Sequence, residues 1–402
     1  MSELTLPQII SALSVRDLTD PAQGPHAIQL LVSRAVDALT DLWGCPARMT
    51  RTRPVVPVAD NYDHLGYPAD AVAREVRYTR YISDTCVLRS HTSAGIPPAL
   101  RRLAREENAP DQVLLALPGI CYRRDSIDRL HTGTPHQLDM WLLRRGGRRL
   151  DHDDLSRMVG GLVEAMLPGR HWRWVAADHP YTTRGRQVDV IDEDEPVELA
   201  ECGMAAAHVL AGAGLDPAEW SGLALGLGLD RALMLRKGIP DIRLLRSTDP
   251  RITEQMLDLN PYRPVSMMPP ARRDISVAVD DGADAETLGD QVREALGEQA
   301  DLVEEVAVLS RTPHDDLPAP ARARLGIVPG QVNVLLRITL RPVDRTLAAH
   351  EVNALRDRIH AAVHRSTTVV AEGSGEHNLV AGPDAQHVGG STVVHRQREV
   401  SG

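Results

Sequence analysis

Apolar residues recur at two different spacings along this chain, and each spacing predicts one kind of element. Residues 26–43, HAIQLLVSRAVDALTDLW, carry apolar side chains at helical spacing, so they predict an amphipathic helix that Gly44 and Pro46 would end. Strands are predicted where apolar and polar residues alternate. Further predicted helices span residues 98–107 and 155–167. Predicted strands span residues 47–58, broken by Pro54 and Pro57, residues 87–93, and residues 173–190, with a turn inside the last.

Residues 121–142, CYRRDSIDRLHTGTPHQLDMWL, predict a strand, a polar turn and a second strand whose charged side chains project from one face. Arg123 opens a basic pair, and the carboxylate of Asp125 follows it. A guanidinium group on a rigid strand can hold two phosphate oxygens at once. This segment is therefore a candidate phosphate-binding element.

A second candidate nucleotide-binding element spans residues 221–235, SGLALGLGLDRALML. Glycines punctuate a predicted strand that runs into a predicted helix. Because glycine has no side chain, a nucleotide can lie against the backbone of such a strand. Arg231 would then stand at the start of the helix beneath the nucleotide.

The pattern changes after Pro269 and Pro270, where a separate domain is predicted. Its elements follow the order strand, helix, strand, strand, helix, strand, which is a ferredoxin-like arrangement. They span residues 273–279, 284–296, 302–310, 332–340, 347–364 and 367–371, with a proline-rich loop over residues 312–330. Residues 372–402 lack periodicity and are predicted to be a flexible tail.

Length and composition narrow the class of protein. A chain of 402 residues with 43% apolar residues is expected to form two or three ordinary globular domains. No run is apolar enough to cross a membrane and the start lacks a signal pattern, so a cytoplasmic location is expected. The four cysteines are far apart, which indicates neither a disulfide framework nor a zinc knuckle. With a net charge of −10, any contact with RNA must come from local arginines.

Several of these segments resemble the class II aminoacyl-tRNA synthetases, and more narrowly the single-chain, organelle-type phenylalanyl-tRNA synthetases. YRRD followed by HQLD resembles their motif 2, and GLGLDR resembles their motif 3. The segments NYDHLGYPADAVA, LRSHTS, GIPDIR and PPARRDISV are similar to the family in the same chain order. The resemblance implies an α+β fold: a class II antiparallel sheet flanked by helices, plus the C-terminal ferredoxin-like domain. It implies a catalytic domain over residues 1–266, an anticodon-binding-like domain over residues 267–371 and the tail over residues 372–402.

The resemblance also implies an ATP site. Arg123 would contact the α-phosphate and Arg231 the adenine or the γ-phosphate. These two arginines would be the catalytic groups, because activation of an amino acid develops negative charge that fixed cations stabilise. The other implied ATP contacts are Asp125, His131, Pro135 and Gly228. Magnesium would bridge the phosphates, with Asp189 as a candidate ligand.

The amino-acid site that the resemblance implies is more polar here than in the family. Its contacts would be His91, Thr92, Ser93, Gln137, Asp139, His179, Tyr181, Ala224 and Gly226. His179 and Tyr181 stand where the family has two phenylalanines that wall the pocket. Asp139 replaces a glutamate, Pro135 a phenylalanine that stacks on adenine, and Glu201 a glycine. Because an unpaired buried donor costs about 1–3 kcal/mol, a polar side chain is expected to fit better than that of phenylalanine. The alternative is that these replacements merely follow the loss of phenylalanine from the whole chain.

Two residue counts are unusual: phenylalanine is absent, and Lys237 is the only lysine among 45 basic residues. A GC-rich genome disfavours the codons of both and explains the lysine count well. It explains the lack of phenylalanine less well, because protein cores normally use that residue. Selection for translation when charged phenylalanyl-tRNA is scarce or wrong is the other explanation, and both stay open.

Three functions remain open from the sequence, and the first is favoured. It is an ATP-dependent ligase that forms the adenylate of phenylalanine or a related, more polar amino acid and transfers it to tRNA. The second is an adenylating ligase with a non-tRNA acceptor in a biosynthetic pathway, which the acidic C-terminal domain favours. The third is a non-catalytic RNA-binding paralogue, which Pro135 favours. The expected partners are an amino acid and tRNA but no membrane, and the chain would act as a monomer or a homodimer.

Overall fold

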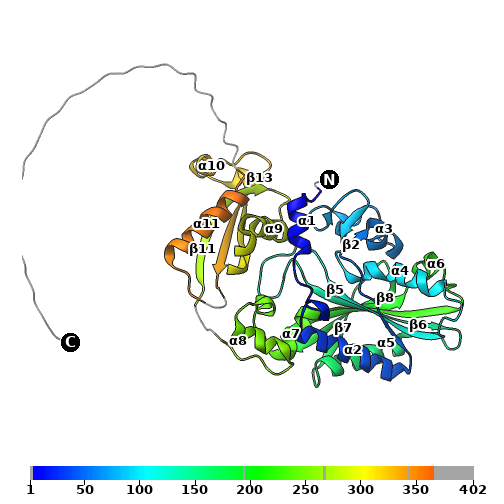
Figure 1. Cartoon of the computed structure of the whole chain (residues 1–402). Helices are drawn as coiled ribbons and strands as arrows, with labels where there is room; N and C mark the ends of the chain where they lie inside the picture. Colours follow the sequence, from blue (N-terminus) through cyan, green and yellow to red (C-terminus); the bar gives the residue numbers. More distant parts are fainter. Residues whose placement is uncertain (1–2, 193–194, 266–268, 343–344, 366–402) are drawn as a thin grey trace, which may run out of the picture. The chain divides into compact units, whose positions relative to one another are not determined.

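The computed structural model describes residues 3–192, 195–265, 269–342 and 345–365, and every structural statement below concerns these residues. Its largest sheet has seven strands in the order β1-β5-β6-β10-β9-β8-β7 (Figure 1). All neighbours are antiparallel except β1 and β5, which confirms the expected antiparallel sheet. The strands are β1 Ala47–Met49, β5 Gln112–Ile120, β6 His136–Arg145, β7 Trp172–Ala176, β8 Thr182–Asp192, β9 Glu195–Ala205 and β10 Trp220–Gly228.

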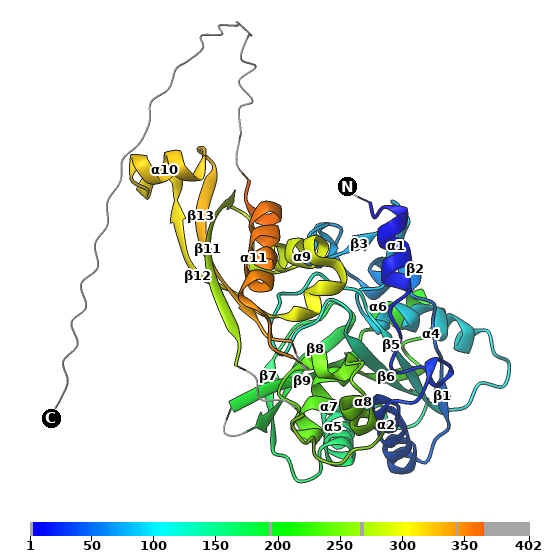
Figure 2. The same ribbon diagram turned by 60° about the vertical axis from the view of Figure 1, so that its left-hand side comes forward.

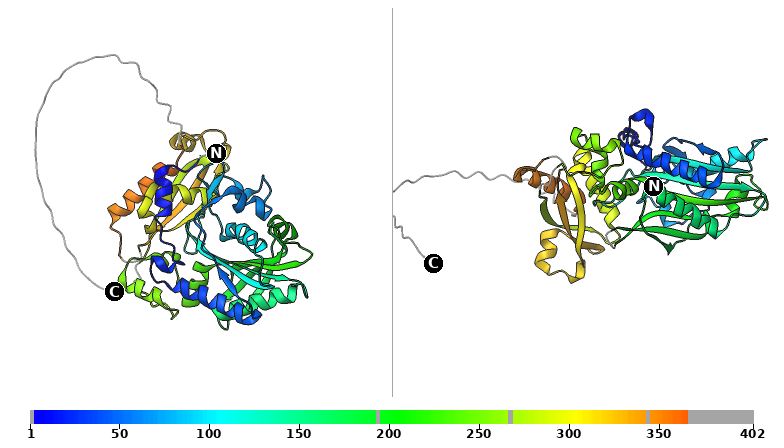
Figure 3. Two further views of the ribbon diagram at one scale, coloured as in Figure 1. Left: turned by 45° about the vertical axis from the view of Figure 1, so that its right-hand side comes forward. Right: turned by 90° about the horizontal axis from the view of Figure 1, so that it is seen from below.

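Helices cover both faces of this sheet. Figure 1 shows α2 and α5 below it and α4 and α6 above it, and Figure 3 shows α2 and α5 side by side. Along β6, Leu138 and Met140 pack toward α2 and α5, whereas Asp139 and Trp141 face the other way, because successive strand residues alternate. The helices are α2 Ala27–Trp43, α4 Ile96–Ala104, α5 His152–Met166, α6 Ala207–Gly212 and α7 Leu229–Lys237.

A smaller sheet, in the order β2-β4-β3, lies near the N-terminal helix (Figure 1). The strand-like segment over residues 47–58, expected to be broken by its prolines, forms two short strands, β1 and β2, that belong to different sheets. Pro54 and Pro57 lack the N–H that a continuous ladder needs. The elements of this region are α1 Leu6–Leu13, β2 Val55–Pro57, α3 Val58–Asn61, β3 Arg80–Tyr81 and β4 Cys86–Leu88. The short helix α8, Pro250–Thr253, comes later in the chain, after α7.

The C-terminal segment forms a three-stranded antiparallel sheet in the order β11-β13-β12, with α9 and α11 on one face (Figure 2). Its elements are β11 Ala271–Asp280, α9 Ala285–Leu296, β12 Val303–Pro313, α10 Ala319–Leu325, β13 Gln331–Leu340 and α11 Ala349–Val363. The first five elements of the expected order are present, whereas the strand over residues 367–371 and the tail lie outside the described residues.

Two details of the sequence-based prediction need correction. The proline-rich loop over residues 312–330 contains the helix α10, because prolines at its start suit the first turn of a helix. Arg123 does not lie on a strand, since β5 ends at Ile120. In the part of the chain that is described, no helix has the length and apolarity that a membrane span requires.

Candidate active site

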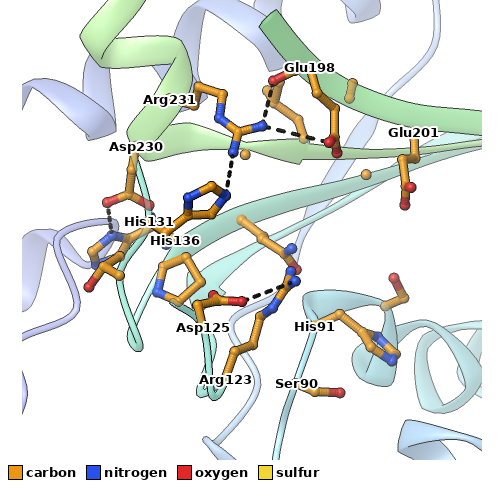
Figure 4. Close-up of a pocket in the computed structure, with 18 of the residues that line it drawn as sticks. Ser90, His91, Arg123, Asp125, His131, His136, Glu198, Glu201, Asp230 and Arg231 are labelled. Carbon is orange, nitrogen blue, oxygen red and sulfur yellow. Dashed lines mark hydrogen bonds and ion pairs between the residues drawn. The ribbon is translucent and has the colours of Figure 1, made fainter. Parts of the chain in front are cut away.

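A cavity of about 620 Å³ opens on the sheet face opposite α2 and α5. Its floor is formed by the strands β6, β10 and β9, and its walls by the loop that joins β5 to β6 and by the first turn of α7. Arg123 and Arg231 both line it, and Figure 4 shows them reaching it from opposite sides. The guanidinium groups of Arg123 and Arg231 therefore line the same cavity.

Strand register sets the chemistry of the floor. Asp139 on β6 pairs with Gly226 on β10, which pairs in turn with Glu201 on β9. Directly paired residues point to the same face, so two carboxylates flank a glycine, with their backbones roughly 10 Å apart. A side chain at Gly226 would lie against Asp139 and fill the trough between them, since its Cβ would come 3.5 Å from Oδ2.

The loop after β5 places Arg123 beside the floor although it has left the strand. The hairpin hydrogen bonding continues through Cys121 N to Pro135 O at 2.7 Å and Arg123 N to Gly133 O at 2.9 Å. The Arg123 side chain is 47% exposed and its Nη2 lies 3.5 Å from Oδ1 of Asp125. A half-exposed guanidinium with one loose carboxylate partner remains able to bind an anion.

Arg231 is held more tightly than Arg123. Its Nη1 donates to the carbonyl oxygen of Glu198 at 2.9 Å, and its Nη2 donates to Nε2 of His131 at 3.4 Å (Figure 4). The other ring nitrogen of His131 lies 2.7 Å from the carboxylate of Asp128. This chain of contacts fixes the plane of the Arg231 guanidinium group over the cavity.

A buried polar cluster lies below the start of β6. Nδ1 of His136 contacts Oδ1 of Asp230 at 2.8 Å, and the backbone N–H of His136 donates to the same carboxylate. The ring's Nε2 accepts from Leu18 N and from Arg246, both at 3.1 Å. Burial alone would raise the pKa of Asp230, but His136 and Arg246 outweigh it and lower that pKa. The cluster ties β6 to the first turn of α7, and so positions Arg231.

Asp139, at the β6 end of the cavity, has a carboxyl group whose pKa is raised. Burial raises the pKa of Asp139 to about 7, although hydrogen bonds from Ser93 and Trp141 oppose the shift. Trp141 Nε1 donates to Oδ1 at 2.8 Å, and the Ser93 hydroxyl donates to Oδ2. Nearby, Oε1 of Gln137 accepts from Thr92 N at 3.2 Å. Asp139 therefore changes charge near neutral pH.

Aromatic rings form the deeper wall. Tyr67 stacks on His91 with centroids 5.8 Å apart, and Tyr181 stacks on Trp141 at 6.3 Å. The rings of Tyr67 and Tyr181 are 6.4 Å apart. Burial lowers the pKa of His91 to about 4, and the charge of Arg123 adds to the shift. His91 is therefore neutral at neutral pH, and the wall is suited to a flat side chain.

An ion pair interrupts this aromatic wall. Nε2 of His179 lies 3.0 Å from Oε2 of Glu201. Burial alone would lower the pKa of His179, but the Glu201 carboxylate outweighs it and raises that pKa. Burial alone would raise the pKa of Glu201, but His179 and then Arg123 lower it. Both shifts favour the charged pair.

The structure brings most of the sequence-predicted residues to this one cavity. Those that line it are His91, Ser93, Arg123, Asp125, His131, Pro135, Gln137, Asp139, Tyr181, Gly226, Gly228 and Arg231. Thr92, His179 and Ala224 lie behind this lining, in contact with Gln137, Glu201 and Trp141 respectively. Asp189 is not brought to the cavity: it is buried on β8, 3.2 Å from Nη2 of Arg173.

Sequence reasoning left out several residues that shape the site. Asp128 contacts His131, the carbonyl oxygen of Glu198 accepts from Arg231, and Asp230 contacts His136. Tyr67 stacks on His91. The sequence marks Glu201 only as a residue that stands where the family has a glycine. Only the strand register places Glu201 on the floor, because the pairing of β9 with β8 is irregular just before Ala200 and the alternation along β9 is interrupted there.

The comparison with protein-family models decides the family. The model described as "tRNA synthetases class II core domain (F)" matches residues 44–256. The chain belongs to the class II tRNA synthetase family. The matched residues include the cavity floor, both arginines and the buried cluster around His136, so the family assignment covers the site just described.

Curated relatives of this class II synthetase are phenylalanine–tRNA ligases. The alpha subunit from Prochlorococcus marinus (strain MIT 9313) is 36% identical over 60% of this chain and 69% of its own length. The chloroplastic/mitochondrial ligase of Arabidopsis thaliana is 29% identical over 79% of this chain and 71% of its own length. The mitochondrial ligase of Saccharomyces cerevisiae is 26% identical over 76% and 79%, respectively.

Among the described residues of the synthetase, no three His, Cys, Asp or Glu side chains lie close enough together to hold a metal ion by themselves. Glu198 lines the cavity beside Arg231, and its side chain is about half exposed. One carboxylate at this place fits an ion that takes most of its ligands from phosphate oxygens and water, as Mg²⁺ does.

Proposed function

We propose that this chain is an ATP-dependent ligase that activates phenylalanine or a related aromatic amino acid and transfers the aminoacyl group to tRNA. The observation that carries the proposal is the shared cavity, in which Arg123 and Arg231 face a floor that holds Asp139. Membership of the class II synthetases and relatives that are phenylalanine–tRNA ligases support it.

In the first step, an oxygen of the amino acid's carboxylate forms a bond to the α-phosphorus of ATP, and the bond from that phosphorus to the pyrophosphate oxygen breaks. Negative charge accumulates on the α-phosphate oxygens as this happens. Arg123 would stabilise that charge because its guanidinium is free enough to turn toward the phosphate. Arg231, fixed by Glu198 and His131, would hold the nucleotide in line.

The amino acid would bind on the floor beside the nucleotide. Asp139 and Gln137 would hold its ammonium group, and its side chain would pack against the rings of Tyr67 and Tyr181. Magnesium would neutralise the phosphates, with Glu198 rather than Asp189 as the carboxylate placed to bind it. In the second step a tRNA hydroxyl would take the acyl group and release AMP.

Two assays on the purified chain test this function. Exchange of labelled pyrophosphate into ATP that depends on an added amino acid is expected, followed by acylation of tRNA. Exchange without acylation of any tRNA would point to a different acceptor. The absence of exchange with phenylalanine, its hydroxylated derivatives and the other standard amino acids would overturn the proposal.

The ionisation of Asp139 predicts a pH dependence. Because its pKa is about 7 in the folded chain, the carboxylate that binds the ammonium group forms only as pH rises through that value. We therefore expect kcat/KM for the amino acid in the exchange assay to rise about tenfold per pH unit below pH 7 and to level off above it. The same burial means that Asp139 lowers the stability of the fold as pH rises from about 4 to about 7, since the unfolded chain loses that proton first.

Asp139→Asn supplies the control. This variant cannot ionise, so its kcat/KM should be low and should lack the rise near pH 7. A wild-type profile that is flat from pH 5.5 to 8 would show that Asp139 does not bind the substrate's ammonium group.

A further inference from the structure

The trough over Gly226 has a carboxylate at each end. Asp139 lies at one end and Glu201 at the other, in one row across three strands. A substrate whose ammonium group is bound at Asp139 would lie over Gly226 and extend toward Glu201. Its own carboxylate must turn toward Arg123, because Glu201 would repel it. The part of the substrate that meets Glu201 is therefore the side chain.

Within the described structure, His179 occupies only one of the two carboxylate oxygens of Glu201. One carboxylate oxygen, Oε2, lies 3.0 Å from His179. The Glu201 side chain is 42% exposed, and the residue lines the cavity together with Tyr67 and Tyr181. A carboxylate has about four sites that accept hydrogen bonds, so this one can accept a further bond from a ligand.

We propose that the His179–Glu201 pair selects an aromatic amino acid that carries a hydroxyl group on its side chain, with Glu201 accepting the hydrogen bond from that hydroxyl. This inference rests on the proposed function and deepens it, because it names the substrate class. The ring would pack against Tyr67 and Tyr181, which line the cavity and whose centroids are 6.4 Å apart.

The charge of the pair favours a neutral donor over a cation. His179 already supplies a positive group to Glu201, so a second cation would face the imidazolium ring. A plain phenyl ring is disfavoured for a different reason. It would displace water from the carboxylate and offer no donor in return, and sites that bind a hydroxyl group discriminate strongly against analogues that lack it.

The experiment measures kcat/KM for pyrophosphate exchange with phenylalanine and with its ortho-, meta- and para-hydroxylated derivatives, which differ from it by one oxygen. Wild type should prefer at least one hydroxylated isomer over phenylalanine by about tenfold or more. Glu201→Ala should abolish that preference, and Glu201→Gln, which keeps a neutral acceptor, should give an intermediate ratio. The preference ratio is the readout, because damage to the fold would lower both rates together.

Glu195→Ala is the matched control. It removes an exposed glutamate from the same strand, β9, at the end away from the cavity, and should leave the ratio unchanged. A wild type that uses phenylalanine as well as every hydroxylated isomer would overturn this inference and leave the proposed function standing. A Glu201→Ala variant with the wild-type ratio would overturn it as well. If neither wild type nor any variant exchanges with any of these amino acids, the proposed function itself fails.

Discussion

Replacing Arg123 with alanine is expected to lower the rate of amino-acid-dependent pyrophosphate exchange about 10²–10³-fold. This is the range found when one hydrogen-bond donor to a charged transition state is removed. Among the arginines that line the cavity, Arg123 has the least restrained guanidinium. Its Nη2 lies 3.5 Å from Oδ1 of Asp125, which is a loose ion pair. It can therefore follow the α-phosphate as the carboxylate attacks.

The free energy of unfolding should change little in this variant. The Arg123 side chain is half exposed, and surface ion pairs contribute roughly 0–1 kcal/mol. The loop itself is held through backbone atoms, including the hydrogen bond from Arg123 N to Gly133 O, which alanine keeps. A loss of rate without a loss of stability would assign Arg123 to the chemistry.

Arg129→Ala is the matched control for this loss. Arg129 is an exposed arginine of the same loop and is not among the residues found to line the cavity. Exchange by this variant should stay within about twofold of wild type. An Arg123→Ala protein with full exchange activity would remove Arg123 from the mechanism.

Replacing Asp230 with alanine is expected to destabilise the fold by about 3–5 kcal/mol, because it removes one partner of a buried charged cluster. Asp230 is 4% exposed and accepts hydrogen bonds from both the ring and the backbone N–H of His136. Without it, two donors lose their acceptor, and Arg246 loses one of the carboxylates that balance its charge, beside Asp17 and Asp301. Urea unfolding of wild type and variant measures the difference.

The pH dependence of that difference follows from the lowered pKa of Asp230. Its contribution is fully present above the ordinary carboxyl range and is lost as pH falls through the lower, folded value. The gap between wild type and Asp230→Ala should therefore be constant from pH 5 to 8 and should shrink in more acidic solution.

Asp111→Ala provides the comparison for stability. Asp111 also pairs with an arginine, Arg145 at 2.7 Å, but its side chain is 79% exposed. That pair should contribute less than about 1 kcal/mol. If both aspartate variants unfold at the same urea concentration, the cluster around Asp230 does not stabilise the chain.

Much of the fold could be predicted because the relevant signals are local. The amphipathic pattern of α2 and the left-handed glycine at Gly44 that ends it depend on neighbouring residues alone. The strand β10 and the helix α7 were predicted within one or two residues for the same reason. The sequence does not predict the strand β5, because a buried strand shows no alternation of apolar and polar residues.

The sequence by itself determined the family motifs, many of the helical and strand-like segments, and twelve of the residues that line the cavity. Only the tertiary structure decided which distant residues meet. Asp230 reaches His136 across 94 positions, Glu201 joins the row of Asp139 through strand register, and Asp189 turns instead to Arg173. The physical reason is that spacing along a chain sets local conformation, whereas the pairing of strands sets which side chains share a face, and that pairing depends on the packing of the whole sheet.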